Sequence, residues 1–219
     1  MKKKGALPLI LILVFVLVLC IGGILAGVMF YQREQDQVNP DIYARLVIPD
    51  TVIDYPVLQN SEDNAFYITH DQDGKENASG ALFTETYNGK DFRDPITVIY
   101  GNNMEDGSMF GSLKNYSDGR YMESHPYIYI YTDNDQTPLK YRVFAAYRSD
   151  NRHIMERFNS GRTEGNRQAY LKSILDNRTM GVQIDRSVSV NTDSRILTLS
   201  THDESGEEYR YLVQACLEK

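Results

Sequence analysis

The sequence has few of the residues that build disulfide frameworks or metal centres. It contains two cysteines, Cys20 and Cys216, and no tryptophan. Cys20 lies in an apolar run and Cys216 near the C-terminus, so we do not expect them to pair within one molecule. The sequence has no Cys-x-x-Cys pair, and its four histidines show no His-x-x-x-His spacing. We therefore expect neither a metal nor another cofactor.

Positive charge is scarce beyond the N-terminus. All 30 acidic residues follow residue 31, whereas three of the 23 basic residues, Lys2–Lys4, precede it. The remaining 20 basic residues give that larger part of the chain a net charge of −10. This sign argues against nucleic acid and anionic lipid headgroups as main partners.

Long apolar runs are absent after residue 31, but one precedes it. Residues 5–31 are uncharged and mostly apolar. Such a run can cross a hydrocarbon core of about 30 Å, and it exceeds the apolar region of about 7–15 residues in a cleaved signal peptide. We expect an uncleaved signal anchor over 1–31, with a cytoplasmic N-terminus and a single membrane crossing. A polar tether over 32–40 and one extracellular domain over 41–219 follow.

Short β-branched and aromatic runs, separated by turn residues, predict a mostly β domain. Eight such runs occur, at 43–48, 52–57, 80–84, 96–100, 127–131, 141–147, 195–201 and 209–217. Residues 108–116 have helical spacing, and 151–178 predicts a helical insertion between two strands. The strands and helices do not alternate regularly, which favours a closed or nearly closed β-barrel of about eight strands with short helices.

One stretch in the last third of the chain indicates a family. Ile196-Leu-Thr-Leu-Ser-Thr-His202, with Arg210 eight residues later, resembles the signature of sortases. These cysteine transpeptidases attach proteins to bacterial cell walls. Their Thr-Leu-Ser-Thr strand ends in the nucleophilic cysteine, and an arginine follows on the next strand. Val98-Ile-Tyr-Gly-Asn-Asn-Met104 resembles the family's Tyr-Gly-His-Asn-Met segment, with Asn102 at the place of the catalytic histidine.

Further matches make the resemblance one to class B sortases over about residues 40–217. The segments that match in order are 48–59, 63–71, 94–101 and 107–113. The helical segment before the last two strands resembles the class B insertion. At Ala44-Arg45 the family commonly has Gly-Trp, a departure that bears on packing. The resemblance implies the sortase barrel.

The resemblance also implies a chemistry, the cleavage of a sorting signal and transfer of its acyl group to an amine. In this family the cysteine thiolate attacks the peptide carbonyl and later serves as the leaving group. The histidine protonates the departing amine and deprotonates the incoming one. The arginine hydrogen-bonds the substrate or the developing oxyanion. His202 and Asn102 occupy the first two positions, and only Arg210 retains its type. Ser200 and Thr201 are the expected substrate-binding residues. An acyl-imidazole formed from an amide is high in energy, and an amide side chain does not titrate usefully.

Three interpretations of function follow. The first is a catalytically impaired, class B sortase-like surface protein that binds sorting-signal peptides of secreted proteins, beside an active sortase or a cell-wall precursor. The second is an active transpeptidase or peptidase that uses atypical residues such as His202. The third is a structural domain with a vestigial groove. The missing thiol favours the first and third, while Arg210 and the retained scaffold favour the first. Cys216 lies about 20 Å along the strand from Arg210, too far to act as a relocated nucleophile.

Overall fold

The computed structural model of the chain describes residues 16–17, 19–27, 39–132, 137–204 and 206–218. The chain divides into two compact units, Met1–Asn39 and Pro40–Lys219. In the first unit, the described residues 16–17 and 19–27 are α-helical and exposed. No helix in the described part of the chain is both long and apolar enough to span a bilayer. Most of the predicted anchor and tether lies outside the described residues.

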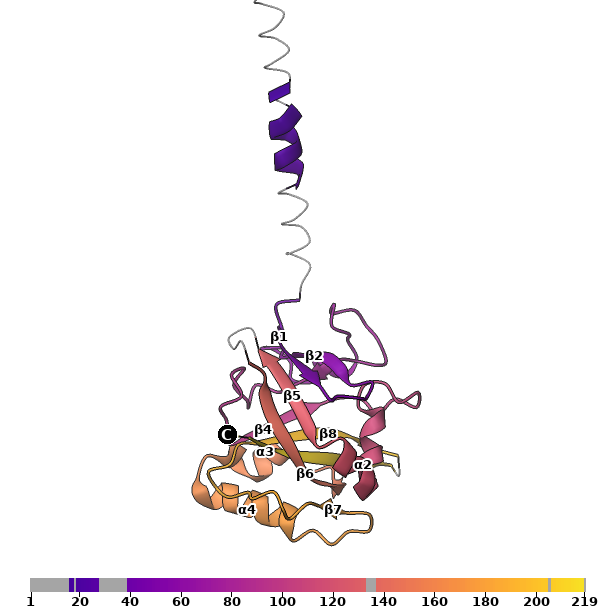
Figure 1. The fold of residues 1–219 in the computed structure, drawn as a ribbon, viewed down its shortest axis with the longest axis vertical. Helices are drawn as coiled ribbons and strands as arrows, with labels where there is room; N and C mark the ends of the chain where they lie inside the picture. The colour runs from indigo at the N-terminus through magenta and orange to yellow at the C-terminus, as the bar shows by residue number, and fades with distance from the viewer. Residues whose placement is uncertain (1–15, 18, 28–38, 133–136, 205, 219) are drawn as a thin grey trace, which may run out of the picture. The chain divides into compact units, whose positions relative to one another are not determined.

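The second unit is built around a closed ring of eight strands (Figure 1). Around the ring these are β1 Ile42–Val47, β2 Asp54–Leu58, β3 Leu82–Phe83, β4 Ile96–Tyr100, β8 Ile196–Asp203, β9 Gly206–Leu217, β6 Leu139–Asp150 and β5 Tyr127–Thr132. Pairing of β5 with both β1 and β6 closes the ring. A short strand, β7 Gln183–Ile184, adds to β6. The predicted mostly β class and eight-stranded barrel are confirmed.

Helical segments connect the strands at three places. They are η1 Phe66–Ile68, η2 Gly111–Ser117, α2 Gly119–Ser124, α3 Ile154–Arg157, η3 Asn159–Gly161 and α4 Glu164–Leu175. The helix predicted at 108–116 starts three residues later and is a 3₁₀ helix, which ends before the N-cap of α2 at Asp118. The predicted insertion lies between β6 and β7 as α3, η3 and α4. A reciprocal pair of hydrogen bonds between Thr163 and Asn166 starts α4.

Two hydrophobic clusters enclose β8 from both sides. Alternate residues such as Leu197 and Leu199 pack inside the barrel. Ile196 packs instead with Tyr170 and Ile174 of α4, which cover the outside of this wall. Because both faces are covered, residues 196–201 are all buried. This explains why the strand reads as a nearly unbroken run of apolar and small residues.

One side chain substitutes for a missing strand beside β4. Strand β3 pairs with β4 only at the end of β4, so the first residues of β4 need other partners for their backbone groups. Asn88 Nδ2 donates to the Ile96 carbonyl at 2.7 Å, and Asn88 Oδ1 accepts from the Val98 N–H at 3.0 Å. Asn88 is 3% exposed. It therefore holds β4 in place where β4 runs beside β8.

Candidate functional site

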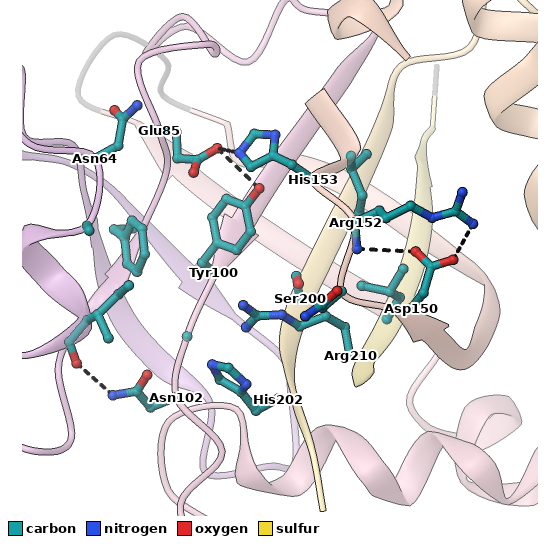
Figure 2. Close-up of a pocket in the computed structure, with 17 residues that line it drawn as sticks. Asn64, Glu85, Tyr100, Asn102, Asp150, Arg152, His153, Ser200, His202 and Arg210 are labelled. Atoms are coloured by element: carbon teal, nitrogen blue, oxygen red, sulfur yellow. Dashed lines mark hydrogen bonds and ion pairs between the residues drawn. The ribbon is translucent and has the colours of Figure 1, made fainter. Parts of the chain in front are cut away.

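The C-terminal ends of β4 and β8 and the start of β9 border a cavity of about 170 Å³ (Figure 2). Asn102 follows β4, His202 lies on β8 and Arg210 on β9, and all three line this cavity. Strand register brings them together, because Tyr100 pairs with Ser200 and His202 pairs with Arg210. The three positions singled out by the sequence therefore share one site.

Arg210 places a positive charge inside this cavity. Its side chain is half-buried, and burial lowers the pKa of its guanidinium, while the neighbouring Tyr100 and Glu85 act in the opposite direction. A guanidinium stays protonated even so. Because the surroundings are partly dehydrated, its hydrogen bonds to a carbonyl or carboxylate of a ligand would be stronger than in water. The arrangement suits peptide binding.

His202 supplies an imidazole to the lining of the cavity. The side chain is half-buried, and its main-chain carbonyl accepts a hydrogen bond from Asn103 Nδ2 at 3.0 Å. None of the described residues that line the cavity is a cysteine. Cys216 is buried in the cluster beneath α3 and α4, where its partner on β8 is Ile196. The cavity therefore presents no sulfur nucleophile.

Comparison with known proteins identifies the family of the chain. Sortase B of Listeria monocytogenes is 33% identical over 189 residues, which are 84% of this chain and 73% of that protein. The chain belongs to the sortase B family. A solved structure of sortase B from Listeria monocytogenes has a TM-score of 0.71 at 30% identity, covering 85% of this chain and 99% of the other. A Staphylococcus aureus sortase B–substrate complex has a TM-score of 0.73 at 25% identity, covering 85% and 84%. No protein-family model matches.

The predicted class B sortase resemblance is thus confirmed at the level of family and fold. Within this sortase B scaffold, Asn102 has a structural task that the sequence did not reveal. Its Nδ2 donates to the Ile68 carbonyl at 2.9 Å and to the Ala78 carbonyl at 3.1 Å. Both amide protons are therefore engaged in joining η1 to the turn before Gly80. Asn102 is a clamp between loops and supplies no titrating group.

Replacing Asn102 with alanine should loosen this wall of the cavity. Two hydrogen bonds to the carbonyls of exposed residues are lost, and water can replace the donor, so we expect the free energy of unfolding to fall by about 0.5–1.5 kcal/mol. Urea denaturation measures the fall, and hydrogen–deuterium exchange should show faster exchange over residues 66–80. The control is Asn115→Ala, at an exposed position. Equal stability of the two variants would show that the clamp contributes nothing.

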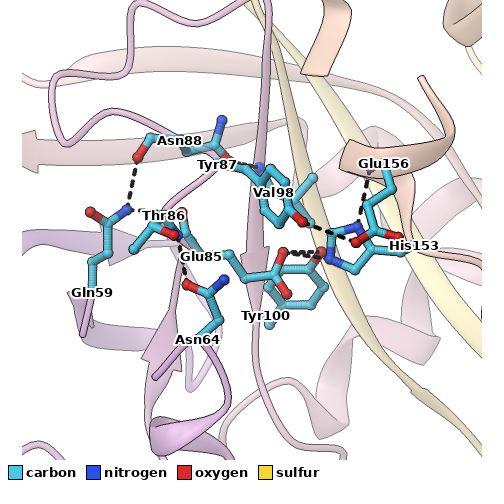
Figure 3. Close-up of polar contacts among 10 residues, drawn as sticks. All are labelled: Gln59, Asn64, Glu85, Thr86, Tyr87, Asn88, Val98, Tyr100, His153 and Glu156. Atoms are coloured by element: carbon cyan, nitrogen blue, oxygen red, sulfur yellow. Dashed lines mark hydrogen bonds and ion pairs between the residues drawn. The ribbon is translucent and has the colours of Figure 1, made fainter. Parts of the chain in front are cut away.

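Hydrogen bonds between distant loops close another side of the cavity (Figure 3). Glu85 Oε2 accepts from the Tyr100 hydroxyl at 3.2 Å and lies 2.7 Å from His153 Nε2. His153 Nδ1 accepts from the Glu156 N–H at 3.2 Å, so the proton of a neutral ring lies on Nε2 and points to Glu85. Burial and the neighbouring Glu85 raise the pKa of the Tyr100 phenol.

This arrangement decides what His153 can do. Both of its ring nitrogens are engaged, one with Glu85 and one with the backbone at the start of α3. A general acid or base needs a nitrogen within reach of the reacting atom. His153 therefore holds the segment after β6 against Glu85, and neither ring nitrogen is placed to act as a general acid or base in the cavity.

The two predicted substrate-binding residues lie on opposite faces of β8. Ser200 lines the cavity with Arg210. Thr201 faces the other way, toward Phe110 and Tyr211, and its Oγ1 is buried without a hydrogen-bond partner among the described residues. The structure therefore brings Ser200, and not Thr201, to the cavity with Arg210.

Two lining residues, Glu85 and His153, carried no sequence signal. They come from loops 68 residues apart in the chain. Their neighbours show neither the alternation of a strand nor a spacing typical of catalytic groups. Only the arrangement of the strands in the folded barrel brings them together, so they could not be identified from the sequence.

Proposed function

We propose that this protein is a catalytically impaired, class B sortase-like protein that binds extended sorting-signal peptides at the cell surface. The observation that carries the proposal is the cavity itself. It keeps a half-buried Arg210 beside His202 at the strand ends, where it offers a charge for binding but no thiol for chemistry. Binding without cleavage would suit a protein that presents peptides to an active sortase or to a cell-wall precursor.

A relative supports the peptide as ligand. The similar Staphylococcus aureus structure is a sortase B–substrate complex. In this chain, the cavity offers an apolar wall from Phe83 and Ile68 next to the polar groups of Ser200 and Arg210. A mixture of apolar wall and a few convergent polar groups is typical of ligand sites.

The membrane-anchored location is part of the same proposal. The apolar run over 5–31 with its basic tail supports one crossing, with the N-terminus cytoplasmic and the barrel outside. Such an anchor would hold the barrel near substrates that emerge from the membrane.

The test is binding of fluorescent sorting-signal peptides to the full-length protein, followed by anisotropy. Arg210→Gln should raise Kd by about 10–100-fold, because a hydrogen bond from a charged donor contributes about 1.5–3 kcal/mol. The control is Arg93→Gln, which removes one exposed positive charge elsewhere. The proposal fails when the unaltered protein binds no such peptide, or when both variants bind equally.

A further inference from the structure

The guanidinium of Arg210 has no hydrogen-bond acceptor among the described residues. A guanidinium carries five N–H donors in a planar fork. At this half-buried position water reaches them only in part, and a donor withdrawn from water without an acceptor costs free energy. These N–H groups therefore favour a ligand that accepts hydrogen bonds. A peptide offers two kinds of acceptor, the neutral carbonyls along its chain and the carboxylate at its C-terminal end.

The two carboxylates that line the cavity are engaged with other side chains. Glu85 accepts a hydrogen bond from the Tyr100 hydroxyl at 3.2 Å, and Asp150 lies 2.5 Å from Arg152. In Figure 2 the dashed lines from Glu85 and Asp150 run to these partners and to His153, and none runs to Arg210. The charge of Glu85 acts on Arg210 at longer range, but a distant charge does not satisfy N–H donors.

The rest of the lining suits the last residue of a peptide. Both amide protons of Asn102 are donated to the Ile68 and Ala78 carbonyls, which leaves its Oδ1 to accept an N–H from a ligand. Ile68 and Phe83 form an apolar wall in the same cavity. The volume of about 170 Å³ is below the range of about 300–1,000 Å³ of whole small-molecule sites, so the cavity suits the end of a chain.

We propose that this cavity takes the free C-terminal end of a peptide, with the terminal carboxylate bound by Arg210. The two oxygens of a carboxylate accept parallel hydrogen bonds from a guanidinium, and such charge-assisted bonds are about twice as strong as neutral ones. The last N–H of the peptide would donate to Asn102 Oδ1, and its last side chain would pack on Ile68 and Phe83. Hydrolysis of a peptide bond is the class of reaction that supplies such an end.

This inference rests on the proposed function, because it concerns which form of a peptide the same site binds most tightly. The charge of the domain argues against a nonspecific origin of the preference. The chain beyond residue 31 carries a net charge of −10, so an additional negative charge on a peptide should weaken its attraction to the protein. Tighter binding of a peptide acid than of its amide would therefore come from a local cation.

The experiment measures binding to the full-length protein by fluorescence anisotropy at constant ionic strength. The peptides are intact sorting signals and a series that ends at successive residues of the same signals. The best-binding member of the series is then made in three forms, with a free C-terminal carboxylate, with a C-terminal carboxamide, and with an added glutamate followed by a carboxamide. The free acid should bind at least tenfold more tightly than either of the other two forms.

Arg210→Gln should remove this preference and bring the Kd values of the free acid and the carboxamide within twofold of each other. The control is Arg93→Gln, which removes a positive charge at an exposed position and should keep the preference of at least tenfold. The ratio of the two Kd values is the readout, because a general loss of peptide binding would weaken both forms equally.

Equal binding of the free acid and the carboxamide by the unaltered protein would overturn this inference and leave the proposed function standing. No binding by any peptide, intact signals included, would overturn both. Equal binding of the free acid and the glutamate form would assign the carboxylate to a side chain and overturn the assignment to a chain end. A preference that persists in Arg210→Gln would overturn the role of this arginine. The comparison on the unaltered protein decides even where the variant does not fold.

Discussion

A sorting-signal peptide incubated with the full-length protein and an amine acceptor is expected to remain uncleaved. The double variant His202→Cys with Asn102→His is expected to cleave it and form a covalent acyl-enzyme. The reason is chemical. A thiolate forms a thioester that an amine can resolve, and a histidine supplies the proton that the departing amine needs. Mass spectrometry of the protein detects the adduct, and chromatography of the peptide measures turnover.

The two substitutions should contribute differently. His202→Cys alone introduces a thiol nucleophile but provides no acid for the leaving amine, so we expect slow acylation at most. Adding Asn102→His should raise the rate by about 10²–10⁴-fold, the usual contribution of general acid–base catalysis. The matched control, Ser124→Cys with Asn115→His, creates the same two residues at exposed positions and should remain inactive.

Stability has to be measured alongside activity. Position 102 loses two hydrogen bonds to the Ile68 and Ala78 carbonyls when histidine replaces asparagine. A melting curve for each variant therefore shows at which temperatures all variants are folded, and the activities are compared at such a temperature.

The possible outcomes of this experiment distinguish the three interpretations of function. Turnover by the unaltered protein that is lost in His202→Ala would overturn the impaired interpretation in favour of an atypical enzyme. A double variant that neither reacts nor binds peptide would favour a vestigial groove. Acylation of the double variant, together with peptide binding by the unaltered chain, would support the first interpretation, a protein that binds peptides without cleaving them.

Local patterns made the barrel predictable. The strands are short runs of β-branched and aromatic residues between turns, and the alternation on β8 separates Leu197 and Leu199, inside the barrel, from Ile196, under α4. His202 and Arg210 meet because β8 pairs antiparallel with the next strand, β9, so their proximity follows from a sequence separation of eight residues. Asn102 joins them through the parallel pairing of β4 with β8.

The parts that escaped prediction depend on contacts between distant loops. Nothing near Glu85 indicates that it meets His153, 68 residues later, because neither residue lies in a periodic segment. Arg148 on β6, Arg152 in the segment after it and Arg157 on α3 line a cavity under the insertion, yet a solvated helix would also show such spacing. Only the packing of the insertion against β6 and β9 shows that they surround a hollow.

Replacing Asn88 with alanine is expected to cost more stability than any exposed substitution in the barrel. The change leaves the Ile96 carbonyl and the Val98 N–H without partners at a site that is 3% exposed. An unsatisfied buried polar group costs about 1–3 kcal/mol, so we expect the free energy of unfolding to fall by about 2–5 kcal/mol. Small domains are stable by only about 5–15 kcal/mol, so the fall is a large part of the total. Urea denaturation followed by circular dichroism measures it.

The Asn88 result also bears on the site, because β4 carries Tyr100 and leads directly to Asn102. A loosened β4 should speed hydrogen exchange in β4 and in its partner β8, and it should weaken peptide binding although Asn88 lies outside the cavity. Asn115→Ala, at an exposed position, should change stability by less than about 0.5 kcal/mol. A stable Asn88→Ala protein with unchanged exchange in β4 would mean that water or a shifted loop satisfies these backbone groups. The strand-like role of Asn88 would then be wrong, and the position of β4 would depend on its pairing with β8 alone.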